Sequence, residues 1–163
     1  MSKKKLLIAA VCVGLLVGLF FISIPAVTIT AQGKRVKVLF YKDHTNFSIR
    51  WRHSVEKEDW EEIFAVSNGT IKIDSTRFKT FGAGVPSHAG KNTYIKDGWV
   101  YMTGIDRVIG KELVIGTGLD TRHRFIHNGS AFPFNKKETA YTIKLERLTV
   151  YQSINYYLDH LMR

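Results

Sequence analysis

The sequence contains a single cysteine, Cys12. One thiol cannot form an intramolecular disulfide, so no disulfide framework holds this chain together. The preceding residue is Val11, where a lipoprotein signal would carry a small side chain. Cys12 is therefore interpreted as a small apolar filler within a membrane helix.

Catalytic and metal-binding motifs are also scarce. No close pair of ligands such as HExxH is present, and a metal site needs three or four converging side chains. Gly116-Thr117-Gly118 lacks the third glycine and the following helix of a phosphate loop, so it is interpreted as a turn at the end of a strand. Ser54 follows His53, but neighbours on a strand point to opposite faces. We therefore expect no enzyme, no metal site and no cofactor.

Acidic residues are few, 14 against 24 basic ones, and the formal net charge is +10. The basic residues are spread along the chain without a recognised binding motif, so nucleic acid is not an expected partner. Such a charge would draw an exported domain towards anionic lipid headgroups, wall polymers or acidic proteins. The favoured interpretation is a solvated surface without a partner.

Charge is absent from Leu6 to Val27, a run long enough to cross a hydrocarbon layer of about 30 Å. The lysines at positions 3 to 5 predict a cytoplasmic N-terminus and an exported C-terminal domain. A cleaved signal peptide is the alternative, although Ala26 and Thr28 fit a cleavage site poorly. The prediction is a single-pass protein of the cytoplasmic membrane, with residues 1–30 as membrane anchor or uncleaved signal.

Residues 34–163 are predicted to form one extracytoplasmic β domain, with the polar residues 31–34 as a short exit from the membrane. Asn68-Gly69, Asp97-Gly98 and Asn128-Gly129 favour the positive backbone angles of tight hairpins. Many short strands with such turns indicate a mainly β fold, either an antiparallel sandwich or a partly open barrel.

The end of the chain departs from the strand pattern. Ile154, Tyr157, Leu158 and Leu161 have the spacing of a helix with one apolar face. We expect a short C-terminal helix that caps an open end or edge of the sheet, with a membrane or partner contact as the alternative.

Two polar residues interrupt apolar stripes on adjacent predicted strands. His53 ends the stripe of Phe47, Ile49 and Trp51, and Glu62 lies within the stripe of Trp60, Phe64 and Val66. Polar residues at core positions break the binary pattern, and such breaks are expected at functional sites.

Turn positions predict how these strands pair. A turn at Asn68-Gly69 places Glu62 opposite Ser75 and Trp60 opposite Arg77, and a turn centred on residues 57–58 places His53 opposite Glu62. The predicted row is His53, Glu62 and Ser75, with Arg77 on the same face. The glycine-rich loop of residues 81–90 follows at the same end.

Three interpretations of this row remain open: a structural pair at the rim of the core, a pocket for a small ligand or partner peptide, and a metal or catalytic site that adds His88. The catalytic one is least favoured, because a strand separates Ser75 from His53. The candidate ligand- or partner-binding residues are His53, Ser54, Glu56, Glu62, Ser75, Arg77, Gly82, Gly84, Pro86 and His88.

The runs His53-Ser54-Val55-Glu56, Glu62-Ile63-Phe64 and Phe81-Gly82-Ala83-Gly84-Val85-Pro86 resemble the bacterial and archaeal domain-of-unknown-function family 1850, over roughly residues 35 to 148. The resemblance implies a small extracytoplasmic domain with an N-terminal signal or anchor. It also implies a gene often placed beside tripartite ATP-independent periplasmic (TRAP) transporters of the TAXI type, and no catalytic role. The family-like positions are His53, Ser54, Glu56, Glu62, Gly82, Gly84 and Pro86.

The expected function is therefore that of a membrane-anchored accessory or binding domain for a TAXI-type TRAP transporter. Its expected partners are a transporter permease or a solute-binding protein. The alternative is a module that binds a small ligand or metal through His53 and Glu62, and a hydrolase is less favoured.

Overall fold

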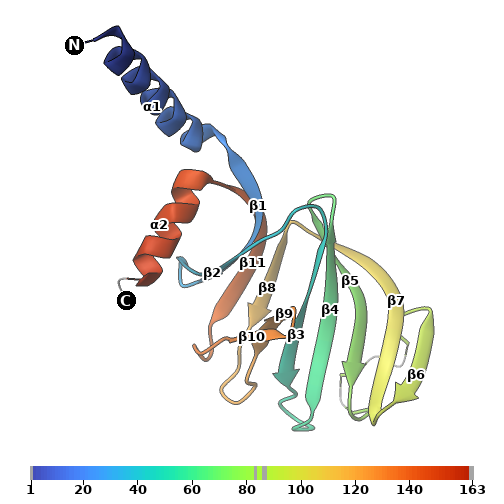
Figure 1. The fold of residues 1–163 in the computed structure, drawn as a ribbon. Coiled ribbons are helices and arrows are strands. Elements are labelled where there is room, and N and C mark those ends of the chain that lie inside the picture. The colour runs from blue at the N-terminus through green and yellow to red at the C-terminus, as the bar shows by residue number, and fades with distance from the viewer. Residues whose placement is uncertain (1, 83, 86–87, 162–163) are drawn as a thin grey trace.

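The computed structural model describes residues 2–82, 84–85 and 88–161. It confirms a mainly β protein with two antiparallel sheets, an N-terminal apolar helix and a short C-terminal helix (Figure 1). The sheets do not close into a barrel within the described part of the chain. Of the two expected architectures, the sandwich is the one observed.

Helix α1 (Lys3–Phe21) projects from the domain and has no buried residue. The Ser2 hydroxyl caps its first turn by accepting a hydrogen bond from the Lys5 N–H at 3.4 Å. Its 19 residues extend about 28 Å at roughly 1.5 Å per residue, close to the thickness of a bilayer's hydrocarbon core. The helix is long and apolar enough to cross a membrane, as either an anchor or a signal sequence.

The apolar run does not stay helical to its end. Residues 22–31 are rich in β-branched side chains, and strand β1 (Ser23–Ala31) follows α1 directly. Val27 is fully buried in the core of the sandwich, and Ala26 is fully buried in a small cluster on the opposite face of β1. The expected extent of the membrane segment, to residue 30, is therefore wrong. The expected polar exit is a hairpin turn at Gln32-Gly33, where both residues have positive φ.

The four-stranded sheet has the order β2-β1-β11-β8, and the seven-stranded sheet has the order β10-β9-β3-β4-β5-β7-β6. All three predicted Asn-Gly and Asp-Gly turns form hairpins with positive φ at both residues. Besides β1, the strands are β2 (Lys34–Phe40), β3 (Thr45–Arg52), β4 (Asp59–Ser67), β5 (Thr70–Phe78), β6 (Asn92–Lys96), β7 (Trp99–Gly110), β8 (Glu112–Gly116), β9 (Arg124–His127), β10 (Ser130–Pro133) and β11 (Ala140–Thr149).

The core lies between the two sheets. Val27, Ile29 and Ile143 face it from the four-stranded sheet, and Ile49 and Phe64 face it from the seven-stranded sheet. A second buried cluster of Phe78, Val100 and Met102 lies further along the wider sheet. The wider sheet therefore has an inner face that the narrower sheet only partly covers.

Helix α2 (Val150–Leu161) confirms the predicted C-terminal helix and contacts β11 and α1. Of the apolar residues that predicted it, Tyr157 contacts Phe40 of β2 with ring centroids 6.5 Å apart, whereas Ile154, Leu158 and Leu161 are exposed. Ser153 is buried, and Tyr156 contacts a small cluster that includes Ala26 and Leu148. The apolar face that was expected to cap the sheet is instead exposed.

Candidate functional site

The β3–β4 hairpin pairs its residues in a register four residues from the expected one. Trp51 opposes Trp60, and Ile49 opposes Glu62. His53 lies just beyond β3, where its N–H donates to the Glu58 carbonyl at 2.8 Å. The predicted pairing of His53 with Glu62 is therefore wrong. Because the shift is even, both residues still belong to the inner face of the sheet.

The β4–β5 hairpin follows the expected register only as far as Phe64, which opposes Ile73. Asp74 is then an extra residue in β5, a β-bulge, and Ile63 opposes Ser75 while Glu61 opposes Arg77. Because one residue is inserted, each later residue of β5 points to the face of the sheet opposite to the one predicted. Ser75 and Arg77 therefore leave the predicted row and lie on the outer face of the sheet.

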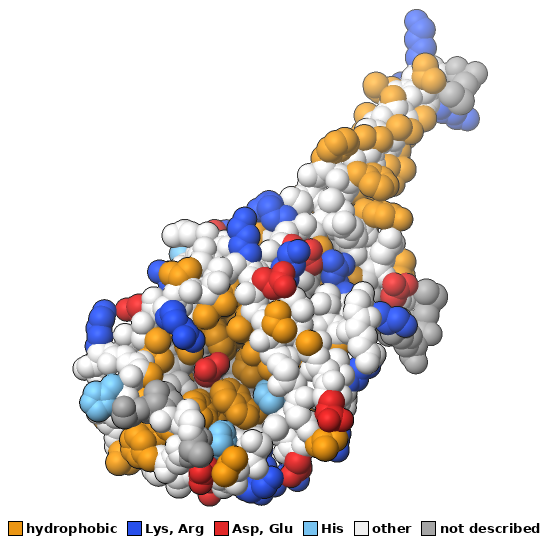
Figure 2. Space-filling view, turned by 180° about the vertical axis from the view of Figure 1, so that it is seen from behind, with side chains coloured by type: hydrophobic (Ala, Val, Ile, Leu, Met, Phe, Trp, Pro, Cys, Tyr) orange, Lys and Arg blue, Asp and Glu red, His pale blue; other side chains and the backbone are white. Residues whose placement is uncertain are grey.

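A cleft of about 450 Å³ remains on the inner face, beside the end of the four-stranded sheet. Trp51, Trp60 and Glu62 line it together with His53 and His123. Figure 2 shows a hollow remote from α1, in which apolar and histidine side chains lie around an acidic one. An adjoining hollow of about 360 Å³ shares Trp60 and Glu62. Sequence reasoning thus placed His53 and Glu62 in one site through an incorrect register.

Aromatic rings form one wall of this cleft. Trp51 stacks on Trp60 with ring centroids 5.4 Å apart, and His123 and His53 each extend the series at 5.7 Å. The Trp60 indole N–H donates to the Thr76 hydroxyl at 2.7 Å, which fixes the ring. Such an ordered set of rings offers a flat, apolar contact surface.

Two titratable groups of the cleft, Glu62 and His123, have pKa values shifted in the direction that favours the uncharged form. Burial raises the pKa of Glu62, and the positive charge of Arg107 opposes that shift in part. Burial lowers the pKa of His123 to about 4, so its ring is neutral at pH 7. Its Nδ1 lies 2.7 Å from the Thr121 hydroxyl. A carboxyl group and a neutral imidazole among aromatic rings can hydrogen-bond a ligand away from bulk water.

A family model described as "Domain of unknown function (DUF1850)" matches residues 47–134, slightly more than half of the chain. The chain belongs to this family. No curated protein and no solved structure matches it. The matched residues run from β3 to just beyond β10 and include the five named residues of the cleft.

Three other family-like positions of this DUF1850 chain, Ser54, Glu56 and Gly82, lie near His53. Ser54 lines the cleft, and the Glu56 N–H donates to His53 Nδ1 at 3.3 Å. A Cβ atom on Gly82 would overlap the Glu56 carboxyl group, so a larger residue at this position would require the Glu56 side chain to move. Gly84 has a φ of 80° and lies exposed.

Two further predicted residues contribute less. His88 is exposed, and Pro86 lies outside the described residues. Trp51, Trp60 and His123 were not predicted as site residues. The two tryptophans read as core, and His123 reaches the cleft because β9 pairs with β3 across more than seventy positions. No local sequence signal marks that pairing.

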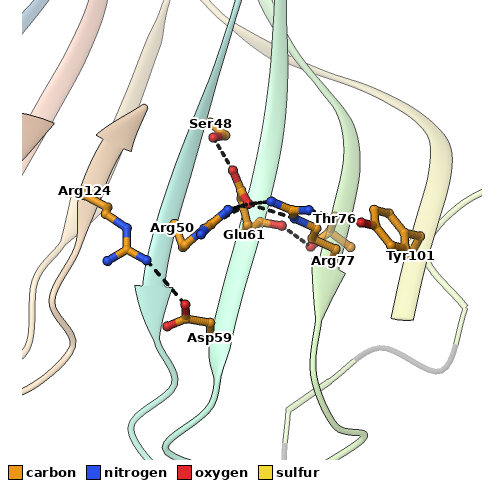
Figure 3. A network of polar contacts seen from close by, with 8 residues as sticks. All are labelled: Ser48, Arg50, Asp59, Glu61, Thr76, Arg77, Tyr101 and Arg124. Carbon is orange, nitrogen blue, oxygen red and sulfur yellow. Dashed lines mark hydrogen bonds and ion pairs between the residues drawn. The ribbon is translucent and has the colours of Figure 1, made fainter. Parts of the chain in front are cut away.

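A separate polar network occupies the outer face of the seven-stranded sheet of this DUF1850 domain (Figure 3). The buried Glu61 carboxylate accepts hydrogen bonds from Ser48 at 2.5 Å, from Arg50 at 2.6 Å and from Arg77 at 2.5 Å. Arg77 also donates to the Tyr101 hydroxyl at 3.1 Å. Side chains from β3, β4, β5 and β7 converge here, so the network ties four strands together.

The Glu61 carboxylate has its hydrogen-bonding capacity met within this network. Burial alone would raise the pKa of Glu61, but hydrogen bonds from Ser48, Arg77 and Arg50 outweigh burial and lower it. The Trp99 ring lies 4.6 Å from the Arg77 guanidinium and covers it. A carboxylate engaged by three donors is a structural element, and the cleft is the better candidate for chemistry.

Two other features of the described residues are weaker candidates for a site. Among the described residues, no three His, Cys, Asp or Glu side chains are placed to hold a metal ion. A hollow of about 580 Å³ near Tyr41 is lined by His44, Lys111 and Arg147. Those three side chains are exposed to solvent, so they lack the desolvation that distinguishes Glu62 and His123.

Proposed function

We propose that this chain is a membrane-anchored extracytoplasmic binding domain that holds a small organic ligand in the cleft between its sheets. The observation that carries the proposal is the pair Glu62 and His123, both desolvated beside stacked indole rings in an open cleft. Burying titratable groups costs stability, and proteins accept that cost most often at sites of function.

The cleft suits a ligand with one flat or apolar part and one polar part. Trp51 and Trp60 supply the apolar wall, and Glu62 and His123 supply hydrogen-bonding groups. The volume of about 450 Å³, with the adjoining hollow, falls in the range of small-molecule pockets. We propose binding without catalysis, because the bulge at Asp74 places the Ser75 hydroxyl on the opposite face from His53.

Anchoring follows from α1. An apolar helix of this length, with three lysines at its N-terminal end, supports a single-pass protein of the cytoplasmic membrane with its N-terminus inside and the β domain outside. In that orientation the β3–β4 turn beside the cleft lies at the end of the domain away from α1 (Figure 1), and the hollow is likewise remote from α1 (Figure 2). Such a position is open to a soluble ligand or a soluble partner.

The family resemblance supports a transport role. We propose that the anchored domain serves a TAXI-type TRAP transporter through its permease or its solute-binding protein. Mild crosslinking in native membranes followed by purification of the tagged chain should recover one of these proteins. Recovery of neither, together with unchanged solute uptake after deletion of the gene, would remove this role and leave ligand binding to be judged separately.

Ligand binding can be followed by intrinsic fluorescence. In a Trp99→Phe background the remaining indoles are Trp51 and Trp60, both in the cleft. We expect at least one of a panel of amino acids, short carboxylates and nicotinamide to change the emission of the full chain in detergent. Glu62→Gln should weaken that response about tenfold, the loss of one hydrogen bond to a charged group. The exposed Glu112→Gln should leave it unchanged.

Stability gives a test that needs no ligand. Because burial raises the pKa of Glu62, this group contributes stability only at acidic pH and loses it as pH rises through and above 4.5. Glu62→Gln should therefore raise the free energy of unfolding at pH 7 by about 1 kcal/mol, as relief of a functional site commonly does. A clear loss of stability in this variant would identify Glu62 as a structural partner and contradict the proposed site.

A further inference from the structure

Helix α2 exposes an apolar surface that the fold leaves uncovered. Ile154 is 46% exposed, Leu158 is 49% exposed and Leu161 is 82% exposed. At 3.6 residues per turn these three side chains lie on one side of the helix, whereas Asp159 lies on the opposite side. A helix of a soluble domain normally turns its apolar side inward. Here the side that contacts the domain carries Ser153 and Tyr156 instead.

This exposed surface lies where α1 joins the domain. The Phe20 ring, in the last turn of α1, stacks on Tyr151 in the first turn of α2 with centroids 4.9 Å apart. The Val150 N–H donates to the carbonyl of Ile22 at 3.1 Å. Figure 1 shows α2 running across the direction of α1. If α1 spans a bilayer, α2 therefore begins at the level where α1 leaves it and extends along the surface.

We propose that α2 lies on the bilayer surface, with Ile154, Leu158 and Leu161 at the boundary between headgroups and acyl chains. The occupant of the exposed face is lipid, because this face continues from α1, which has no buried residue and is apolar from Leu6 to its end at Phe21. Tyr151 and Tyr157, both about half exposed, add the aromatic rings that favour this depth. The contact adds a second attachment to the anchor and limits rotation of the domain about α1.

The proposal rests on the anchoring by α1 put forward above, and one preparation tests both. The full chain is reconstituted at low density in vesicles of phosphatidylcholine and phosphatidylglycerol. The native Cys12, labelled with an environment-sensitive dye, reports insertion of α1. In a Cys12→Ser background the dye is placed by Ile154→Cys or Leu158→Cys, and by Asp159→Cys as the matched control. All three positions are exposed, so these variants keep the core intact.

We expect blue-shifted emission at positions 154 and 158, and quenching by headgroup-region nitroxide lipids at least about twofold stronger than at 159. If Cys12 is shielded but 154 and 158 are as wet as 159, the anchor stands and the surface contact is wrong. If shielding at 154 and 158 disappears on further dilution of chains among vesicles, the occupant is a second copy of the chain, which also overturns the proposal. If Cys12 itself is not inserted, both proposals fail.

Discussion

Glu61 and Glu62 are consecutive residues of one strand with opposite roles. Their side chains point to opposite faces of β4, as strand geometry requires. On the outer face, the Glu61 carboxylate accepts hydrogen bonds from Ser48, Arg50 and Arg77, and these bonds lower its pKa. Glu62 is desolvated in the inner cleft, and its pKa rises. The surroundings of a carboxyl group, and not its identity, thus separate a structural acid from a candidate ligand-binding acid.

The outer network predicts an acid-sensitive contribution from Glu61. Its lowered pKa means that this contribution is present above pH 4.5 and lost as pH falls through the folded-state pKa. Glu61→Gln should cost about 2 kcal/mol at pH 7, because two arginines lose their charged partner. Urea unfolding of the full chain in micelles at pH 7 and below pH 4.5 checks this. The difference between variant and parent should shrink in acid, and a constant difference would contradict the assignment.

His123 predicts a second pH dependence, in a separate range. Its pKa is about 4 in the folded chain against an ordinary value of 6.5, so the unfolded chain takes up the proton first as pH falls. The free energy of unfolding should fall by up to about 3 kcal/mol across this range, since one pKa unit corresponds to roughly 1.4 kcal/mol.

His123→Phe tests that dependence, because phenylalanine keeps a ring beside Trp51 but cannot titrate. Thermal unfolding should vary less between pH 6.5 and 4 in this variant than in the parent. The exposed His44→Gln is the matched control and should retain the parent's pH profile. If thermal unfolding of His123→Phe and of the parent depended on pH in the same way, protonation of His123 would not lower the free energy of unfolding.

At the scale of elements, the sequence predicted which segments are strands better than how they pair. The Asn-Gly and Asp-Gly turns are determined by two adjacent residues, and all three were found. The β3–β4 register was wrong because apolar residues fit the inner face after any even shift, and the Trp51–Trp60 stack selects one of them. The split of the apolar run between α1 and β1 was missed because both environments accept the same side chains.

The bulge at Asp74 is the clearest case of a feature without a sequence signal. It predicts different effects of substitution and deletion at one position. Asp74→Ala should change stability by less than about 0.5 kcal/mol, because this side chain is exposed. Deleting Asp74 would keep Arg77 opposite Glu61, but no residue of β5 would then span residues 104–106 of β7, which lie between the pairs Ile73–Arg107 and Ser75–Thr103, so we expect a larger loss of stability than for the substitution. Circular dichroism melts of both variants decide this, and similar melts would show that the bulge is dispensable.

At the scale of the whole molecule, the family-matched residues do not form a complete sandwich. Strands β1, β2 and β11 lie outside residues 47–134, and they supply three of the four strands of the narrower sheet. The inner face of the wider sheet is covered mainly by these flanking segments. The same segments carry α1 and α2, so membrane attachment and closure of the core depend on the ends of the described chain.

This arrangement predicts the outcome of two truncations. A chain that begins at Ile22 loses α1 and the Phe20–Tyr151 stack, which should cost about 1 kcal/mol, because α1 contributes no buried residue. A chain that begins at Gln32 also loses β1, and with it Val27 and Ile29 from the core and the partner of β11. That loss should exceed the total stability of a domain of this size. Thermal melts should show a cooperative transition for the first chain and none for the second, and a cooperative transition in the second would show that β1 is not part of the folding unit.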